Sequence, residues 1–574
     1  MHCSFWLFSL ALVQLAATAA TPYERERNLD ELARRYTKRT PGGIHLPLFS
    51  RKLSSLERRG TASAIGLGDD VDVAYTVLMT IGGITTPLIV DTGSSDLWVM
   101  SDACTSGCEG NVPVYPQASF RPSGLDVAMI YGDSTTGTFA TGTIGEDTVG
   151  LAGLTLTNQY FAAINRTNTS VVDVGAAGIF GLGFPVNSVI WNNVFGDHLD
   201  KRELSSREEQ VDGETPLNRP KIKLGSPFPN THFRRTKFPT LPGLLGGSSS
   251  QHAPRQTTSV IDSALASFST LGPFLTRLVA QGTLSQPMVS VTLQRDTVDV
   301  GGNEGVLSIG ELPNDVSSSD MTWAPLRGYT QAEGGLPAPS SSPNEVYPIA
   351  WEVMLDGVYF DGEKLPASTL SSSTIKLSAL IDTGNSLIRG PQDIVSQIFR
   401  TIGTTFPCNE PHTLAFQIGG KMFPVDPRDF VGQAFTNNVQ SCTANLVATD
   451  PPQVGGYQFS WSIGTPFLKG VLSSYYYGNL SFPSVDPPKI GFLSTVPNDA
   501  ADQLKAAVSI ASKAGNFPAV SEPAPSGTVT PALTKADNVA SATARVPTSS
   551  ARSRFSAPSV ITMTLSLLAI PLLW

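Results

Sequence analysis

The chain has 574 residues and a net charge of −9 at pH 7, with 41% hydrophobic and 15% charged residues. This length exceeds one ordinary domain and predicts at least two lobes with accessory segments. The acidic balance argues against nucleic-acid binding. The 52 glycines and 43 prolines indicate many short strands joined by turns.

The first twenty residues predict a secretory signal peptide. Residues 5–20 form a short apolar run that ends in Ala-Thr-Ala-Ala, although the positive charge that normally precedes such a run is weak. The run is too short to span a membrane as a helix. The alternative is a genuine N-terminal core helix.

The next segment, residues 21–59, is strongly basic. It carries ten Lys or Arg against five Asp or Glu, and its removal would take the net charge from −9 to −14. Charge runs are usually solvated surface. Four dibasic pairs in one short segment nevertheless favour proteolytic processing, for which the best position is after Arg59.

Predicted strands follow this segment. Between residues 71 and 99 apolar and small polar residues alternate, with Tyr75, Val77, Met79 and Ile81 on one face, which predicts a hairpin. Residues 127–137 predict a strand, a tight turn and another strand, with Tyr131 just before the turn.

An apolar run that ends on an aspartate occurs twice. Residues 88–95 read Leu-Ile-Val-Asp-Thr-Gly-Ser-Ser, and residues 379–386 read Ala-Leu-Ile-Asp-Thr-Gly-Asn-Ser. Asp91 and Asp382 thus each end a predicted buried strand, where a carboxylate needs donors such as Thr or Ser hydroxyls and Gly N–H groups. Two unrelated capping aspartates are the alternative, which two matching copies disfavour.

A second matched pair follows the first. Residues 177–183 read Ala-Gly-Ile-Phe-Gly-Leu-Gly, and residues 461–467 read Trp-Ser-Ile-Gly-Thr-Pro-Phe. A glycine after an apolar strand suits a strand that passes closely over another backbone. The two pairs together indicate an internal duplication of the chain.

Two carboxylates that face each other about 3 Å apart cannot both ionise, so they hold one proton between them. The ionised member can take a proton from water while the protonated member hydrogen-bonds a substrate carbonyl. With these motifs the chain resembles the pepsin-like aspartic endopeptidases over roughly residues 70–495, and in particular the GPI-anchored, yapsin-like fungal members.

The resemblance implies an all-β (mainly β), bilobal fold with the cleft between two related lobes, residues 60–326 and residues 327–497. It further implies that residues 21–59 are a propeptide removed by a dibasic-specific processing protease. Protein or peptide substrates, a monomeric state, and a reaction without cofactor or metal also follow from it.

The resemblance assigns roles to individual residues. Asp91 and Asp382 would be catalytic, and a flap closing over the substrate would contain Tyr131, Gly132 and Asp133. The active-site loops would be supported by Thr92, Gly93, Ser94, Thr383, Gly384 and Asn385. Asn385 departs from the family, which usually has Thr or Ser there. Its amide can still donate to a carboxylate, but with a different reach, so we expect a changed pH optimum.

Four cysteines remain once Cys3 is discarded with the signal peptide, and they permit three connectivities. The pairing that keeps each bridge within one lobe, and that the resemblance implies, is Cys104–Cys108 with Cys408–Cys442. A CxxxC metal site lacks further His or Cys ligands nearby. N-glycosylation sequons start at Asn165, Asn168 and Asn479.

Three segments do not fit the two-lobed pattern. Residues 198–255 are polar and predict a structureless surface insertion in the first lobe, after which residues 260–281 predict a helix interrupted at Gly272. Residues 498–549 are rich in Ser, Thr, Pro and Ala and predict a stalk. Residues 550–574 predict a GPI-anchor signal with its attachment site at Ser549, which would tether the protein to the outer cell surface; a tail-anchored helix is the alternative.

Two other functions compete with an endopeptidase. A catalytically silent, pepsin-like binding protein at the cell surface would use the same cleft, but the presence of both Asp91 and Asp382 argues against it. A structural wall glycoprotein would explain the stalk and tail but neither motif pair.

Overall fold

The computed structural model describes residues 33–52, 73–208, 254–293 and 305–514, with short gaps at 35, 111, 133–137, 170, 314–315, 334, 372–374, 435–439 and 453–457. The predicted signal peptide, the sequence around Arg59, Ser549 and the predicted GPI signal lie outside the described residues. Within the described part, no helix is both long and apolar enough to cross a membrane.

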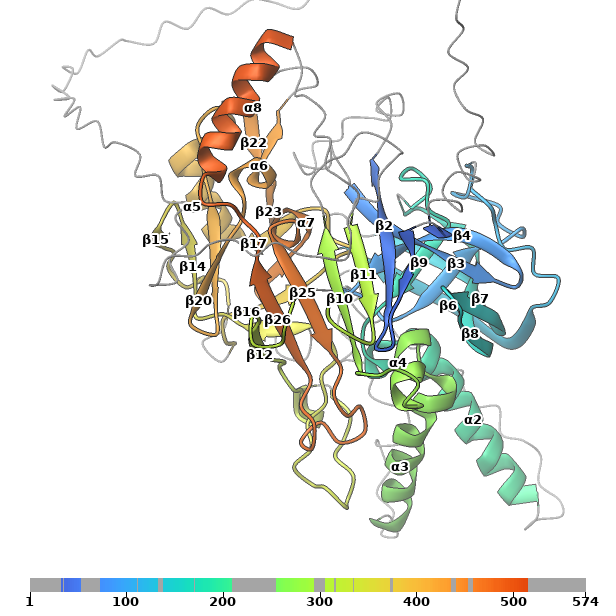
Figure 1. Ribbon diagram of the computed structural model, residues 1–574. Helices are drawn as coiled ribbons and strands as arrows, with labels where there is room; N and C mark the ends of the chain where they lie inside the picture. The colour runs from blue at the N-terminus through green and yellow to red at the C-terminus, as the bar shows by residue number, and fades with distance from the viewer. Residues whose placement is uncertain are drawn as a thin grey trace, which may run out of the picture.

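The predicted mainly β, two-lobed architecture is confirmed (Figure 1). The first half of the chain contains β1 (Lys38–Arg39), β2 (Ile44–Lys52), β3 (Val73–Ile81), β4 (Ile84–Asp91), β5 (Leu97–Met100), β6 (Arg121–Tyr131), β7 (Thr138–Leu151), β8 (Leu154–Thr167), β9 (Gly178–Gly181), β10 (Met288–Leu293) and β11 (Gly305–Ile309). The alternating face of β3 that the sequence predicts is buried, since Tyr75, Val77, Met79 and Ile81 are at most 1% exposed.

The second half contributes smaller sheets and completes the large one. Its strands are β12 (Thr322–Pro325), β13 (Glu352–Met354), β14 (Gly357–Phe360), β15 (Glu363–Lys364), β16 (Ser378–Ile381), β17 (Ile388–Pro391), β18 (Phe406–Pro407), β19 (Leu414–Ile418), β20 (Lys421–Pro424), β21 (Val431–Gln433), β22 (Ser441–Ala444), β23 (Leu446–Thr449), β24 (Trp461–Ile463), β25 (Val471–Tyr476) and β26 (Lys489–Ser494). The large sheet runs β12-β26-β25-β10-β11-β2-β3-β4-β9-β5-β8-β7-β6, so the second-half strands β12, β26 and β25 form one end of it and join the first-half strands through β10.

Strand β2 belongs to the segment expected to be a propeptide, yet it lies inside the large sheet between β11 and β3. Leu46, Leu48 and Phe49 are buried there, and the ring of His45 contacts Ser308 Oγ (2.8 Å) and Glu311 Oε1 (2.9 Å). In this structure the segment is therefore part of the folded core.

Helices flank the predicted insertion. They are α2 (Val189–Glu208), preceded by the 3-10 turn η2 (Pro185–Asn187), and then α3 (Pro254–Leu271) and α4 (Phe274–Ala280). The expectation that structure is lost from residue 198 is wrong for residues 198–208, which continue α2. An ion pair between Asp197 and Lys201 at i,i+4 (2.6 Å) stabilises this helix. The predicted interruption at Gly272 is confirmed, because α3 ends at Leu271.

The second lobe carries η3 (Gln331–Glu333), α5 (Gln392–Ile402), α6 (Pro427–Phe430), α7 (Thr465–Leu468) and α8 (Ala500–Ala514). The predicted start of the stalk at residue 498 is wrong, because α8 packs against α6 and buries Leu504, Val508 and Ala511. The alanines there form a helix with an apolar face, whereas their abundance alone resembles a stalk.

Candidate active site

The two aspartates end matching strands in the two lobes. Strand β4 ends at Asp91 and runs parallel to β9, and β16 ends one residue before Asp382 and runs parallel to β24. The glycine that closes each crossing strand is required, because a Cβ on Gly181 would lie 2.5 Å from the carbonyl carbon of Ser95 and one on Gly464 would collide with the backbone. Both halves of the predicted repeat thus adopt the same local arrangement.

The two threonines after the aspartates bind each other's loops. The N–H of Thr92 donates to Thr383 Oγ1 (3.0 Å), and the N–H of Thr383 donates to Thr92 Oγ1 (3.0 Å). Each hydroxyl donates in turn across the lobe boundary, Thr92 to the carbonyl of Ile381 (2.8 Å) and Thr383 to that of Val90 (2.7 Å). All four bonds are buried, so they fix the two loops relative to each other.

The glycines of the two triplets leave room for the opposite carboxyl group. A Cβ on Gly93 would lie 2.5–2.6 Å from the carboxyl atoms of Asp382, and one on Gly384 would lie 2.7 Å from Cγ of Asp91. Real Cβ atoms do not approach other atoms this closely. Only glycine at both positions lets the two carboxyl groups face each other.

The two carboxyl groups receive different donors. Asp91 is 6% exposed and accepts from the N–H of Gly93 (2.8 Å) and from Ser94 Oγ (2.5 Å), while Asp382 accepts from the N–H of Gly384 (2.9 Å). Burial raises the pKa of Asp91, and burial together with the charge of Asp91 raises the pKa of Asp382 well above its usual value. The two carboxyl groups therefore retain one proton between them.

Asn385, at the position that corresponds to Ser94, does not act as a donor to Asp382. Its amide nitrogen donates to Ser462, to Oγ at 3.0 Å and to the carbonyl at 3.3 Å. Its Oδ1 accepts from the N–H of Leu387 (3.1 Å) and from Nε of Arg389 (3.4 Å). Both the nitrogen and the oxygen of this amide thus form hydrogen bonds within the second lobe.

The predicted flap is the hairpin of β6 and β7, in which Tyr131 pairs with Thr138. The hydroxyl of Tyr131 accepts from Nε1 of Trp98 (2.8 Å), and Gly132 begins the turn with a φ of 85°. Asp133 lies outside the described residues. The Trp98 bond, which the sequence did not predict, fixes the ring at the base of the hairpin.

Similarity to known proteins identifies the family of the chain. A profile described as eukaryotic aspartyl protease matches residues 74–208 and 229–482, most of the chain. The chain belongs to the aspartyl protease family. It is 24% identical to an aspartic protease of Phaffia rhodozyma over 76% of this chain and 80% of the relative, and 23% identical to major aspartyl peptidase 1 of Cryptococcus neoformans var. grubii over 78% and 73%. It is also 25% identical to pepsin A of Suncus murinus over 73% and 84%. This aspartyl protease is an aspartic-type endopeptidase.

Two aromatic side chains of the second lobe bind a first-lobe residue next to Asp91. We call the pair Asp91 and Asp382 the dyad. The carbonyl of Leu182 accepts from Trp351 Nε1 (2.9 Å) and from the hydroxyl of Tyr477 (2.6 Å), while its N–H donates to the carbonyl of Asp91 (2.8 Å). One first-lobe residue thus connects two second-lobe side chains to the backbone of a dyad aspartate. No local pattern in the sequence marks this contact, because its partners are far apart in the chain.

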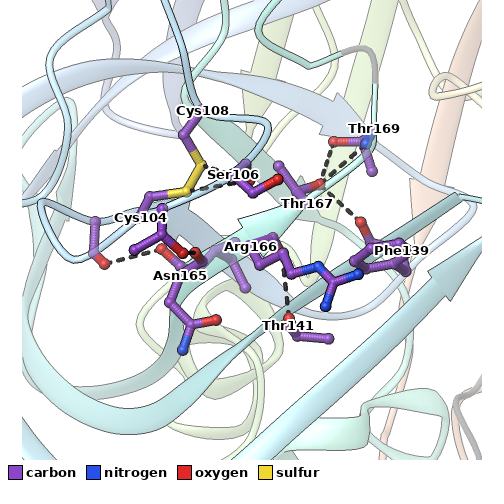
Figure 2. Close-up of a disulfide and its surroundings, with 12 residues drawn as sticks. Cys104, Ser106, Cys108, Phe139, Thr141, Asn165, Arg166, Thr167 and Thr169 are labelled. Atoms are coloured by element: carbon purple, nitrogen blue, oxygen red, sulfur yellow. Dashed lines mark hydrogen bonds between the residues drawn. A yellow bond between two sulfur atoms is a disulfide. The ribbon is translucent and has the colours of Figure 1, made fainter.

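Both predicted disulfides of the protease are confirmed. Figure 2 shows the Cys104–Cys108 loop against the end of β8, where the N–H of Thr105 donates to the carbonyl of Asn165 (2.9 Å) and the N–H of Thr167 to that of Ser106 (3.0 Å). The side chains of Asn165 and Asn168 are exposed there. Glycosylation at these positions and at Asn479 stays a prediction.

Asp96 is a second buried carboxylate that the sequence did not single out. It accepts from Ser188 Oγ (2.5 Å) and from the N–H groups of Val189 (2.9 Å) and Ile190 (3.1 Å), so it caps the start of α2. Burial raises its pKa to about 6 from the ordinary value of 3.8. The sequence feature that could have drawn attention to Asp96 is its position five residues after Asp91.

Asp96→Asn should remove one source of pH-dependent stability from the protease. Because the folded pKa lies above the unfolded one, this carboxyl stabilises the fold most below pH 4 and loses that contribution as the pH rises to about 6. The free energy of unfolding of the variant should therefore gain on that of the parent by up to about 3 kcal/mol between pH 4 and 6.

Urea unfolding at pH 4, 5, 6 and 7 measures this difference. Asp126→Asn, at an exposed position on β6, is the matched control and should show no such trend. A difference between parent and Asp96→Asn that stays constant over this range would contradict the assignment.

Proposed function

We propose that Asp91 and Asp382 carry out the hydrolysis of peptide bonds by this endopeptidase. The observation that supports the assignment most strongly is the mutual approach of the two carboxyl groups, for which both triplets need glycine. Their unequal donors favour an ionised Asp91 beside a protonated Asp382.

In the proposed reaction Asp91 is the general base and Asp382 the general acid. A water bound between them gives a proton to Asp91 while its oxygen attacks the substrate carbonyl carbon, and Asp382 gives its proton to the carbonyl oxygen. The tetrahedral intermediate returns that proton to Asp382, the amide nitrogen takes the proton from Asp91, and the C–N bond breaks. Tyr131 and Gly132 would cover the cleft and exclude water.

We further propose that the protease is made as a zymogen and is processed after Arg59. The dibasic pairs support cleavage, and the position of β2 supports a stable folded precursor, because Leu46 and Leu48 of β2 are buried between β11 and β3. The segment up to Arg59 would then be displaced from the sheet on activation.

Secretion and attachment to the outer cell surface through a GPI anchor complete the proposal. They are supported by the apolar residues 5–20, the two disulfides, the polar stalk that follows α8, and the apolar C-terminal run after Ser549. In this respect the chain is proposed to be similar to the yapsin-like proteases.

Cleavage of a mixed peptide library between pH 3 and 7 tests this function. Secreted protein ending before Ser549 should be most active in acid, and a statine-type transition-state mimic should block it. The absence of cleavage by protein shown to be processed would favour the silent binding protein instead.

A further inference from the structure

The second lobe lacks the hydroxyl donor that the first lobe provides to its aspartate. Ser94 Oγ bonds Asp91 at 2.5 Å, but the amide nitrogen of Asn385 donates to Ser462. Asp382 is nevertheless in the same buried pair and must alternate between charged and neutral forms during the proposed reaction. A nearby cation would stabilise the charged form of Asp382 in addition to the N–H of Gly384.

Arg389 is placed to provide that stabilisation. It lies on β17 opposite Ser462 of β24, and its Nε donates a long hydrogen bond (3.4 Å) to Oδ1 of Asn385. Asn385 thus links Ser462 and Arg389 into one cluster, and its N–H donates to the carbonyl of Asp382 (3.3 Å), which places the cluster beside this aspartate. The positive charge of Arg389 acts on Asp382 and opposes the rise of its pKa caused by burial and by Asp91.

The other titratable groups near the dyad are an aspartate and two tyrosines. Asp91 faces Asp382 directly. The charge of Asp382 also acts on the buried hydroxyl of Tyr475 on β25. The charges of Asp96 and Asp91 act on Tyr131 in the flap. The pKa values of both tyrosines are raised by burial, so both stay neutral over the acid range. Among these groups of the described structure, Arg389 alone is a cation.

We propose that Arg389 is a positioning residue of the dyad, whose guanidinium group, oriented by Asn385, gives Asp382 the electrostatic stabilisation that Ser94 gives Asp91. This inference rests on the proposed function of the two aspartates and adds the element that sets their pH range. The two lobes therefore support their aspartates by different means, a hydroxyl in one and a cation in the other.

The sign of the effect follows from the charge. Removing a cation beside the dyad makes each of its two ionisations harder, so both limbs of the pH profile of kcat/KM move to higher pH. In Arg389→Met we expect a shift of about half a pH unit or more, below that of a direct ion pair because the side chain is partly exposed.

The test compares pH profiles of the processed protease and four variants. Arg389→Met should shift both limbs upward, Arg389→Lys should keep them near the parent, and Arg389→Met with Asn385→Thr should move them back, since the new hydroxyl replaces the lost charge. Arg400→Met removes an equal charge from an exposed position on α5 and should shift nothing. Equal profiles for the parent and Arg389→Met would overturn the proposal.

A second readout does not depend on turnover. In protein with ¹³C-labelled aspartate, the carboxyl titration of the dyad should move upward in Arg389→Met relative to the parent and to Arg389→Lys. A parent without acid peptidase activity would refute the proposed function, while this titration would still decide the role of Arg389. If Arg389→Met lowers the thermal midpoint of unfolding, the titration of Arg389→Lys is compared with that of Arg389→Gln. These two variants differ in charge, so this comparison then decides the role of Arg389.

Discussion

Asp91→Asn and Asp382→Asn should each lower kcat/KM for peptide cleavage by at least about 10³-fold. Asparagine has nearly the same shape as aspartate, but its amide can neither take a proton from water nor give one to a carbonyl oxygen. The Thr92–Thr383 bonds and the donors of the loops should remain, so the loss should lie in kcat rather than in folding. Steady-state cleavage of a peptide substrate in acid measures the effect.

Asp126→Asn is the control for this experiment, because it makes the same chemical change at an exposed position of the first lobe. It should retain the activity of the parent. Retention of more than a tenth of the parental kcat/KM by either dyad variant, with the protein processed and its disulfides formed, would refute the assignment of the two aspartates.

Gly93→Ala and Gly384→Ala should each lower kcat/KM by about 10²-fold or more. The new methyl group would lie within 2.7 Å of the carboxyl group of the opposite aspartate, so the two lobes must separate or the carboxyl group must turn away. A displacement of about 1 Å in a reacting group costs about this factor. The effect should appear in kcat and in the affinity for a transition-state mimic.

Gly196→Ala provides the matched control, since a Cβ there meets nothing within 4 Å and the residue lies within α2. This variant should keep full activity and gain up to about 1 kcal/mol in stability, because alanine favours the helix over glycine. Full activity in Gly93→Ala or Gly384→Ala would mean that the carboxyl groups do not approach each other as described.

The sequence predicted the parts of the fold that repeat or alternate locally. The two Asp-Thr-Gly turns, the buried face of β3 and the break before α4 all follow from patterns of a few residues. Predictions from composition failed at residues 198–208 and 500–514, where polar or alanine-rich segments form helices. In α8 the spacing of Leu504 and Val508 was the better signal, since it puts both on one face.

The less predictable part of the site depends on contacts between distant segments. The direction in which the amide of Asn385 points is decided by Ser462 on another strand, and the pKa of Asp96 is decided by burial under α2. The cluster with Arg389 likewise requires β17 and β24 to be neighbours. The sequence could identify which side chains are unusual, but not what they contact.

Contacts between distant parts of the chain determine what a cut in residues 209–253 would do. In the precursor the chain before that segment contributes β2 and the chain after it contributes β11, and these two strands pair along five residues. The threonine bonds, the Leu182 contacts and the packing of α2 on α3 also join the two sides. A protease cut there would persist as a two-chain enzyme, held together without a covalent link, and its fragments would separate only on denaturation.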